Sequence, residues 1–249
     1  MTSVQDRVLT DRDIKDGLAK DWLATLPAHR LMAEFSLWSA DLVRLADDMA
    51  RVDPHVDLYH VDVADGFFSP ALLFFPDLTA ACAKRTTKPI HVHLMVQDAL
   101  LLDQIRQFAD AGANLISVHA ENANRDVALA LIADLGLHAG LVLQVQTPVA
   151  DVARLLGHIT MLTLLGTRIG IKGQGLDVQA NSRLAQAKAM IAAADLPQRI
   201  ILAADGGIRE HPVPGLRLAG AETIVMGSLA FNAPDLAARM AWVHQQPGH

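Results

Sequence analysis

Short apolar runs alternate with longer amphipathic stretches along most of the chain. Eight runs have the length and composition of strands buried on both faces, and each precedes a stretch with helical spacing. The runs cover residues 30–38, 58–63, 89–96, 114–120, 138–145, 160–165, 199–204 and 222–227. The helical stretches cover residues 40–51, 76–86, 97–111, 123–135, 148–157, 178–195, 212–219 and 231–245. This α/β pattern predicts a parallel sheet closed into a single (β/α)8 TIM barrel, with an open doubly wound sheet as the alternative.

An amphipathic stretch precedes the first predicted strand. Residues 11–26 place Ile14, Leu18, Trp22 and Leu26 at helical spacing. We expect an extra N-terminal helix within an extension of residues 1–29, covering the N-terminal end of a barrel formed by residues 30–249. A helix that binds a partner is the alternative.

Composition and charge narrow the class of protein. The length of 249 residues suits one α/β barrel, and the net charge of −6 argues against a nucleic-acid partner. A single cysteine, Cys82, excludes a disulfide framework and fits a reducing compartment. The first residues carry charges where a signal peptide needs an apolar run, and no run is long enough to span a membrane. We expect a soluble, cytoplasmic protein with no membrane partner.

Ionisable side chains occur at the ends of several predicted strands, where the chemistry of α/β barrels is located. Residues two apart on a strand point to the same side, so His60 and Asp62 share a face of the second strand, and His91 and His93 share a face of the third. A lone histidine in such a position is usually a hydrogen-bonded core residue, but several at one end of a sheet favour a functional site. The ionisable residues at the strand ends are, in chain order, His60, Asp62, His91, His93, His119, Glu121 and Asp205.

These side chains favour a metal site. Two imidazoles with two carboxylates form a nitrogen and oxygen shell suited to zinc, iron(II), manganese or cobalt. Buried charges must be paired or bind a metal. The residues alone do not decide whether His91 or His93 would be the ligand from the third strand.

Glycines close the last two predicted strands, in ADGGI (204–208) and MGS (226–228). Backbone N–H groups at glycines can approach an anion closely, and the loops after strands seven and eight often bind phosphate in this fold. Arg168 and Lys172 lie in the loop GTRIGIKGQG (166–175) after the sixth strand. Either could reach a phosphate, or be a solvated loop charge.

Six motifs in the same order make the chain resemble the ribulose-phosphate 3-epimerase family from about residue 31 to residue 232. They are FSLWSADL (35–42), HVDVADGFFSP (60–70), HLMV (93–96), SVHAEN (117–122), ADGGI (204–208) and AGAETIVMGSLAF (219–231). The resemblance implies an isomerase that inverts C3 of a phosphorylated ketose, with one divalent metal ion (Zn²⁺, Fe²⁺, Mn²⁺ or Co²⁺). It also implies a homo-oligomer, since family members form dimers or larger rings.

The resemblance assigns roles to four of the strand-end residues. It implies that His60, Asp62, His93 and Asp205 bind the metal, which selects His93 over His91. Asp62 and Asp205 would lie on opposite faces of the substrate. One would remove the C3 proton and the other would return a proton to the far face, through an enediolate.

Further residues are expected to contact the sugar phosphate. Ser36 lies in the first motif, two methionines match positions that surround the enediolate in the family, and the glycine motifs would hold the phosphate. The expected substrate-binding residues are Ser36, Met95, Met161, Gly206, Gly207, Gly227 and Ser228, with His119, Lys172 and Gln174 as further candidates.

Two departures from the family motifs predict an altered substrate. Ala64 stands where the family has a third methionine, which would widen the pocket beside Asp62. The family's short Asn-Pro-Gly-x-x-Gly-Gln loop is replaced by the longer GTRIGIKGQG, which lacks Asn-Pro. We therefore expect a ketose phosphate other than ribulose 5-phosphate, such as a tetrulose or hexulose phosphate.

Three other functions are alternatives to an epimerase. Decarboxylases on the same barrel use Asp-x-Lys-x-x-Asp, but DVADG has Ala64 in place of the lysine. A lyase acting on a ketose phosphate would use the same metal and enediolate. A non-catalytic sugar-phosphate sensor would keep the glycines but has no need of both Asp62 and Asp205.

Overall fold

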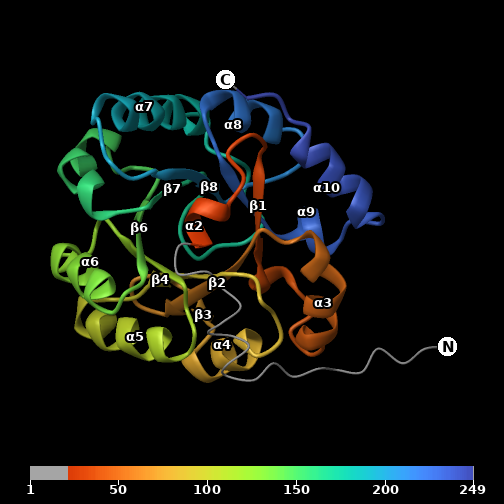
Figure 1. Ribbon diagram of the computed structural model, residues 1–249. Coiled ribbons are helices and arrows are strands. Elements are labelled where there is room, and N and C mark those ends of the chain that lie inside the picture. Colours follow the sequence, from red (N-terminus) through yellow and green to blue (C-terminus); the bar gives the residue numbers. More distant parts are fainter. Residues whose placement is uncertain (1–21, 249) are drawn as a thin grey trace.

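Eight parallel strands form a closed barrel in the computed structural model, which describes residues 22–248 (Figure 1). The strands are β1 (Met32–Ser36), β2 (Leu58–Asp65), β4 (Ile90–Met95), β5 (Leu115–His119), β6 (His138–Leu143), β7 (Met161–Leu165), β8 (Ile201–Asp205) and β9 (Thr223–Met226). The barrel closes because β1 pairs with both β2 and β9, with Ser36 opposite His60 and Phe35 opposite Met226. The (β/α)8 prediction is confirmed, and the open sheet is wrong.

Helices form a ring around the barrel (Figure 1). They are α3 (Leu45–Val52), α4 (Pro76–Ala83), α5 (Asp98–Asp110), α6 (Arg125–Asp134), α7 (Ala180–Ala193), α8 (Val213–Ala219), α9 (Ser228–Phe231) and α10 (Leu236–His244), with 3-10 helices η1 (Leu37–Ser39), η2 (Asp53–His55) and η3 (Val149–His158). None of these described helices is long and apolar enough to cross a membrane.

Two of the predicted helices differ from those observed. The helix expected over 40–51 begins only at Leu45, because Asp41 accepts a hydrogen bond from the backbone N–H of Val43 and holds a turn there. The stretch expected as an α-helix over 148–157 is the 3-10 helix η3. Its buried Val149, Val152 and Leu155 are three residues apart, so three residues per turn keep them on one face.

A short strand, β3 (Leu72–Leu73), pairs antiparallel with the end of β2 and was not predicted. The carboxylate of Asp65 holds the turn before β3 by accepting hydrogen bonds from the backbone N–H groups of Phe67 at 2.9 Å and Phe68 at 2.8 Å. It also accepts a hydrogen bond of 2.8 Å from the backbone N–H of Gln97. Burial alone would raise the pKa of Asp65, but these hydrogen bonds lower it below its usual value. The loop after β2 is thereby fixed to the start of α5, beside the mouth of the barrel.

A short helix, α2 (Trp22–Thr25), covers the N-terminal end of the barrel (Figure 1). Trp22 is buried, and its ring meets that of His138 edge to face at 5.2 Å between centroids. These four residues agree with the expected N-terminal helix, whereas Ile14 and Leu18 lie outside the described residues. The apolar cluster at this end consists of Trp22, Leu23, Met32, Leu58, Leu115, Met161, Ile201 and Ala203.

Candidate metal centre and active site

Four side chains from three strands converge at the C-terminal end of the barrel. One potential ligand atom from each of His60, Asp62, His93 and Asp205 lies within 4.8 Å of all the others. The parallel register sets Asp62 opposite His93, with Nδ1 of His93 at 3.5 Å from Oδ1 of Asp62. Nδ1 of His93 is 3.8 Å from Oδ2 of Asp205, and Nε2 of His60 is 3.3 Å from Oδ1 of Asp62. These are the four residues expected to bind a metal, so a single ion could contact all of them.

A buried carboxylate below this group fixes the orientation of His60. Oε2 of Glu34 lies 3.0 Å from Nδ1 of His60 and 2.6 Å from Nδ1 of His91. Burial would raise the pKa of Glu34, but His91 and His60 lower it to about 2. The ionised carboxylate only accepts hydrogen bonds, so the Nδ1 atoms of both histidines carry the protons that they donate. Nε2 of His60 is left with a lone pair directed at Asp62.

A second chain of hydrogen bonds orients His93. Its Nε2 lies 2.9 Å from Nε2 of His119, whose Nδ1 is 3.1 Å from Oε2 of Glu121. Burial would raise the pKa of Glu121, but hydrogen bonds from His119, Thr147 and the backbone of Gln144 lower it to about 2. Burial lowers the pKa of His119 to about 4, so the neutral ring donates to Glu121 and accepts from His93.

The hydrogen bonds therefore leave lone pairs on Nε2 of His60 and Nδ1 of His93, both facing carboxylates. Among the described residues, neither nitrogen has a hydrogen-bond partner. Burial alone would lower the pKa of His60, but Asp62 and Glu34 raise it well above its usual value, so the site favours a positive charge on Nε2, carried by a proton or by a metal ion that displaces it. Two imidazole nitrogens and two carboxylates that face one another favour a positive charge between them. The residues present thus fit a divalent cation of the kind that binds imidazole and carboxylate.

The two aspartates differ in their protonation equilibria. Burial would raise the pKa of Asp62, but His60 and His93 lower it far below its usual value. Its second oxygen accepts a hydrogen bond of 2.6 Å from the hydroxyl of Ser36. Burial and the charge of Asp62 raise the pKa of Asp205, although His60 opposes this. The pair therefore offers one ionised carboxylate and one carboxyl group that retains a proton more readily.

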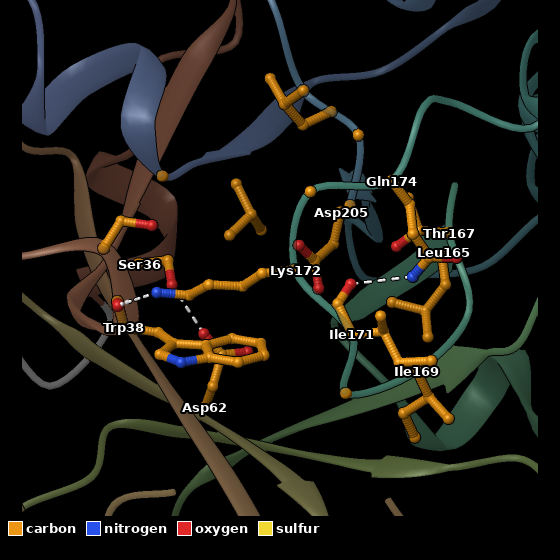
Figure 2. Close-up of a pocket in the computed structure, with 18 of the residues that line it drawn as sticks. Ser36, Trp38, Asp62, Leu165, Thr167, Ile169, Ile171, Lys172, Gln174 and Asp205 are labelled. Carbon is orange, nitrogen blue, oxygen red and sulfur yellow. Dashed lines mark hydrogen bonds between the residues drawn. The ribbon is translucent and has the colours of Figure 1, made fainter. Parts of the chain in front are cut away.

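A pocket of about 290 Å³ opens above this centre (Figure 2). Its walls are the loops that follow β1, β7, β8 and β9. Gly207 in the loop after β8 has φ +73° and packs so closely on the backbone of Leu176 that a Cβ would lie 2.9 Å from it. The expected site residues that line the pocket are Ser36, Asp62, His93, Met95, Lys172, Gln174, Asp205, Gly206, Gly207, Gly227 and Ser228.

The long loop after β7 reaches across the pocket. The ammonium group of Lys172 donates a hydrogen bond of 2.5 Å to the carbonyl oxygen of Trp38 and lies 4.7 Å from the centre of the indole ring (Figure 2). The amide of Gln174 donates to the carbonyl oxygens of Arg168 and Ile171, which braces the loop from within. Lys172 is therefore placed to meet a bound molecule, while Gln174 shapes the loop that carries it.

Three expectations do not match the positions of the residues. Met161 begins β7 and is buried in the cluster at the N-terminal end of the barrel, away from the pocket. His119 lies behind His93 and does not line the pocket. Ala64 is buried beside β3 and is likewise absent from the pocket wall, so it does not widen that pocket.

Glu34 was missed by sequence reasoning because the run around it was interpreted as continuously apolar. A usable signal was present, since an acidic residue in the middle of a strand buried on both faces needs a partner. Trp38 was also missed, because its carbonyl and ring become part of the site only through the loop after β7.

The fold and the site define a (β/α)8-barrel enzyme with a centre of two histidines and two aspartates beneath an open pocket. The profile of the ribulose-phosphate 3 epimerase family matches residues 32–231 of the chain. The chain belongs to this family and is thus an isomerase.

Known relatives cover most of the chain. The ribulose-phosphate 3-epimerase 1 of Cupriavidus necator is 36% identical over 206 residues, which are 80% of this chain and 84% of the relative. The ribulose-phosphate 3-epimerase of Synechocystis is 34% identical, covering 84% of this chain and 90% of the relative. The ribulose-phosphate 3-epimerase of Escherichia coli is 32% identical, covering 80% of this chain and 88% of the relative.

Solved structures with the same fold include more distant proteins. Orotidine 5'-phosphate decarboxylase from Pyrococcus horikoshii aligns with a TM-score of 0.62 and 16% identity, covering 86% of this chain and 98% of that one. The 3-hexulose-6-phosphate synthase from Salmonella typhimurium aligns with a TM-score of 0.61 and 18% identity, covering 86% and 96%. At these identities the likeness shows the fold alone.

Proposed function

We propose that the protein is a metal-dependent epimerase that inverts C3 of a phosphorylated ketose by proton transfer between two carboxylates. The observation that carries this proposal is the convergence of His60, Asp62, His93 and Asp205, with both imidazole lone pairs directed at the carboxylates. Membership of the ribulose-phosphate 3-epimerase family supports the reaction class.

The two aspartates divide the proton transfer. Asp62, with its lowered pKa, is the base that removes the C3 proton, and Asp205, with its raised pKa, delivers a proton to the other face. They stand on β2 and β8 with β1 and β9 between them, so they approach the substrate from different directions. The bound cation would stabilise the negative charge that develops on the substrate oxygens during enolisation. In the reverse direction the two carboxyl groups exchange roles.

The phosphate of the substrate is placed at the glycine loops after β8 and β9. Gly206, Gly207, Gly227 and Ser228 line the pocket there, and backbone N–H groups can approach an anion where no Cβ intervenes. Lys172 adds a positive charge on the loop after β7, where it would pair with an anionic or hydroxyl group of the substrate.

The substrate is proposed to differ from ribulose 5-phosphate. The loop of residues 166–175 supplies Lys172, Gln174 and several further residues of the pocket wall, so a loop of altered length and sequence changes the shape of the site. An assay of tetrulose, pentulose and hexulose phosphates would test this. Preference for a tetrulose or hexulose phosphate is expected, and a clear preference for ribulose 5-phosphate would contradict the altered specificity while leaving the epimerase assignment intact.

The reaction itself is tested by metal analysis together with exchange of the C3 proton in deuterated water. An epimerase with this centre incorporates deuterium at C3 when a divalent ion is bound. A sugar-phosphate sensor would bind the same ligands without exchange. Absence of exchange for every ketose phosphate in the metal-loaded protein would refute the proposal.

We also propose that the protein is a cytoplasmic homo-oligomer. Large apolar side chains are exposed on the segments that follow β1 and β2, including Val43, Phe67 and Leu72, which are 94%, 82% and 81% exposed. Exposed apolar surface of this kind is often covered by another subunit. Light scattering coupled to size-exclusion chromatography measures the mass directly, and a monomer at micromolar concentration would contradict the proposal.

A further inference from the structure

A single carboxylate lies inside the barrel directly below the proposed metal centre. Glu34 is on β1 and has no exposed surface. Its Oε1 has no hydrogen-bond partner among the described residues, so all of its contacts there pass through Oε2. Burying a carboxylate in this way costs free energy unless its charge is compensated.

The compensation comes from two imidazoles that meet at one oxygen. Oε2 of Glu34 is 3.0 Å from Nδ1 of His60 and 2.6 Å from Nδ1 of His91. The two rings stand edge to face, with centroids 4.7 Å apart and planes at 82°. Nε2 of His91 is bonded in turn to the hydroxyl of Ser117 at 2.7 Å. Gly140 on the neighbouring strand leaves the space that this hydroxyl occupies, since a Cβ there would collide with it.

We propose that Glu34 is a positioning residue for the metal centre. Its carboxylate, held in place by His91 and Ser117, fixes His60 with Nδ1 protonated and Nε2 free to bind the ion. It also places a negative charge on the far side of the ligand, which makes the imidazole a stronger donor. This inference rests on the proposed function, because it assumes that His60 binds a metal ion.

The same three side chains could be taken for a metal site of their own, since Glu34, His60 and His91 also lie close together. Their distances argue against this. Separations of 2.6 Å and 3.0 Å between nitrogen and oxygen are those of hydrogen bonds, whereas two ligand atoms that each lie about 2.0–2.2 Å from a tetrahedral zinc ion are about 3.3–3.6 Å from one another. The group therefore supports the centre above it.

The test compares E34Q with the wild type by measuring the dissociation constants of Zn²⁺ and Co²⁺. Glutamine keeps the volume of the side chain and removes its charge. We expect metal binding to weaken about 10- to 100-fold, with an altered visible spectrum of the Co²⁺-loaded protein. The metal-free variant should unfold at a lower temperature than the wild type, because the hydrogen bonds from both imidazoles lose their ionised acceptor, so the change in metal affinity is the deciding measurement.

A matched control is T223V. Thr223 is also buried in a strand of the barrel, its hydroxyl has no hydrogen-bond partner among the described residues, and it pairs in register with Met32 and Ala203. We expect its metal affinity to stay within twofold of the wild type. A purely structural role for Glu34 would lower the unfolding temperature of the metal-free E34Q protein while leaving its metal affinity unchanged.

The outcomes separate the two proposals. If the wild type binds no divalent ion, the proposed function is refuted. If the wild type binds an ion and the dissociation constant of E34Q lies within threefold of the wild-type value, only the role of Glu34 is refuted. If E34Q does not fold, nitrogen NMR of the histidines in the zinc-loaded wild type tests the role of Glu34 instead. Protons on Nδ1 of both His60 and His91 support the inference, and their absence overturns it.

Discussion

At the scale of single residues, identical side chains acquire different properties from their surroundings. Asp62 and Asp205 are both aspartates beside His93, the first buried and the second partly exposed, yet the pKa of Asp62 is lowered and that of Asp205 is raised. The difference arises because Asp62 has the shorter contacts with the imidazoles and accepts a hydrogen bond from Ser36, while Asp205 faces the charge of Asp62. This difference is what the proposed division of base and acid between the two carboxyl groups requires.

The D205N substitution tests this division. We expect turnover to fall by about 10³-fold or more, because general acid–base catalysis contributes factors of about 10²–10⁴ and a proposed metal ligand is altered as well. Circular dichroism should show an unchanged fold. Activity within tenfold of the wild type would argue against Asp205 as the acid.

The K172M substitution tests the residue that crosses the pocket. Methionine keeps much of the length of the side chain and removes the ammonium group. We expect KM for the ketose phosphate to rise about tenfold with a smaller change in kcat, because the lost charge is the one proposed to pair with the substrate. The control is K84M, at an exposed lysine after α4 that does not line the pocket. Equal KM values for both variants would remove Lys172 from the site.

At the scale of elements, the two ends of the barrel have separate tasks. The loops after the strands carry the pocket, and α2 closes the opposite end with Trp22 and Leu23 packed among the first residues of the strands. Met161 belongs to that closing cluster even though it was expected at the substrate. An element that stabilises the barrel from below should therefore affect stability more than chemistry.

The W22A substitution separates the two tasks. We expect the free energy of unfolding to fall by about 3–5 kcal/mol, the usual range for a large buried aromatic side chain replaced by alanine. Urea denaturation would measure this, with V178A at a 97% exposed position as the control, expected within about 0.5 kcal/mol of the wild type. The turnover of folded W22A protein should be close to that of the wild type, and a large loss of kcat would show that the lower end influences the site.

At the scale of the whole molecule, the metal ion is expected to stabilise the fold as well as the reaction. An ion present at 100 times its dissociation constant stabilises the native state by about 2.7 kcal/mol. For a domain of this size, that corresponds to roughly 5–10 °C in the unfolding temperature. A chelator should therefore lower Tm by this amount, and added metal should restore it.

The control for metal removal is H93A, which lacks one proposed ligand. Its Tm should respond far less to the chelator than that of the wild type. A wild type whose Tm is the same with and without chelator would indicate that no tightly bound ion contributes to stability.

The fold follows from the sequence because its signals are repeated. Eight apolar runs and the helical stretches after them all point to one closed sheet, so errors such as η3 or the late start of α3 do not change the topology. The convergence of His60, Asp62, His93 and Asp205 was also predictable, since these residues stand at strand ends within recognisable motifs.

Depth along a strand and contacts between strands were harder to predict. Met161 begins β7 four positions before Leu165, which lines the pocket, because the sequence does not fix where its strand enters the barrel. The hydrogen bonds of Glu34 join residues 26 and 57 positions apart, a relation that depends on register in three dimensions. The crossing of Lys172 to Trp38 spans 134 positions and depends on the path of a loop.

The pairing of β1 with β9 has a consequence for biosynthesis. The first and last strands must both have left the ribosome before the sheet can become a cylinder, and Asp205 emerges long after His60, Asp62 and His93. A nascent chain that ends before β8 carries three of the four proposed ligands on an open sheet. The proposed centre is therefore completed late, only after almost the entire polypeptide has been translated.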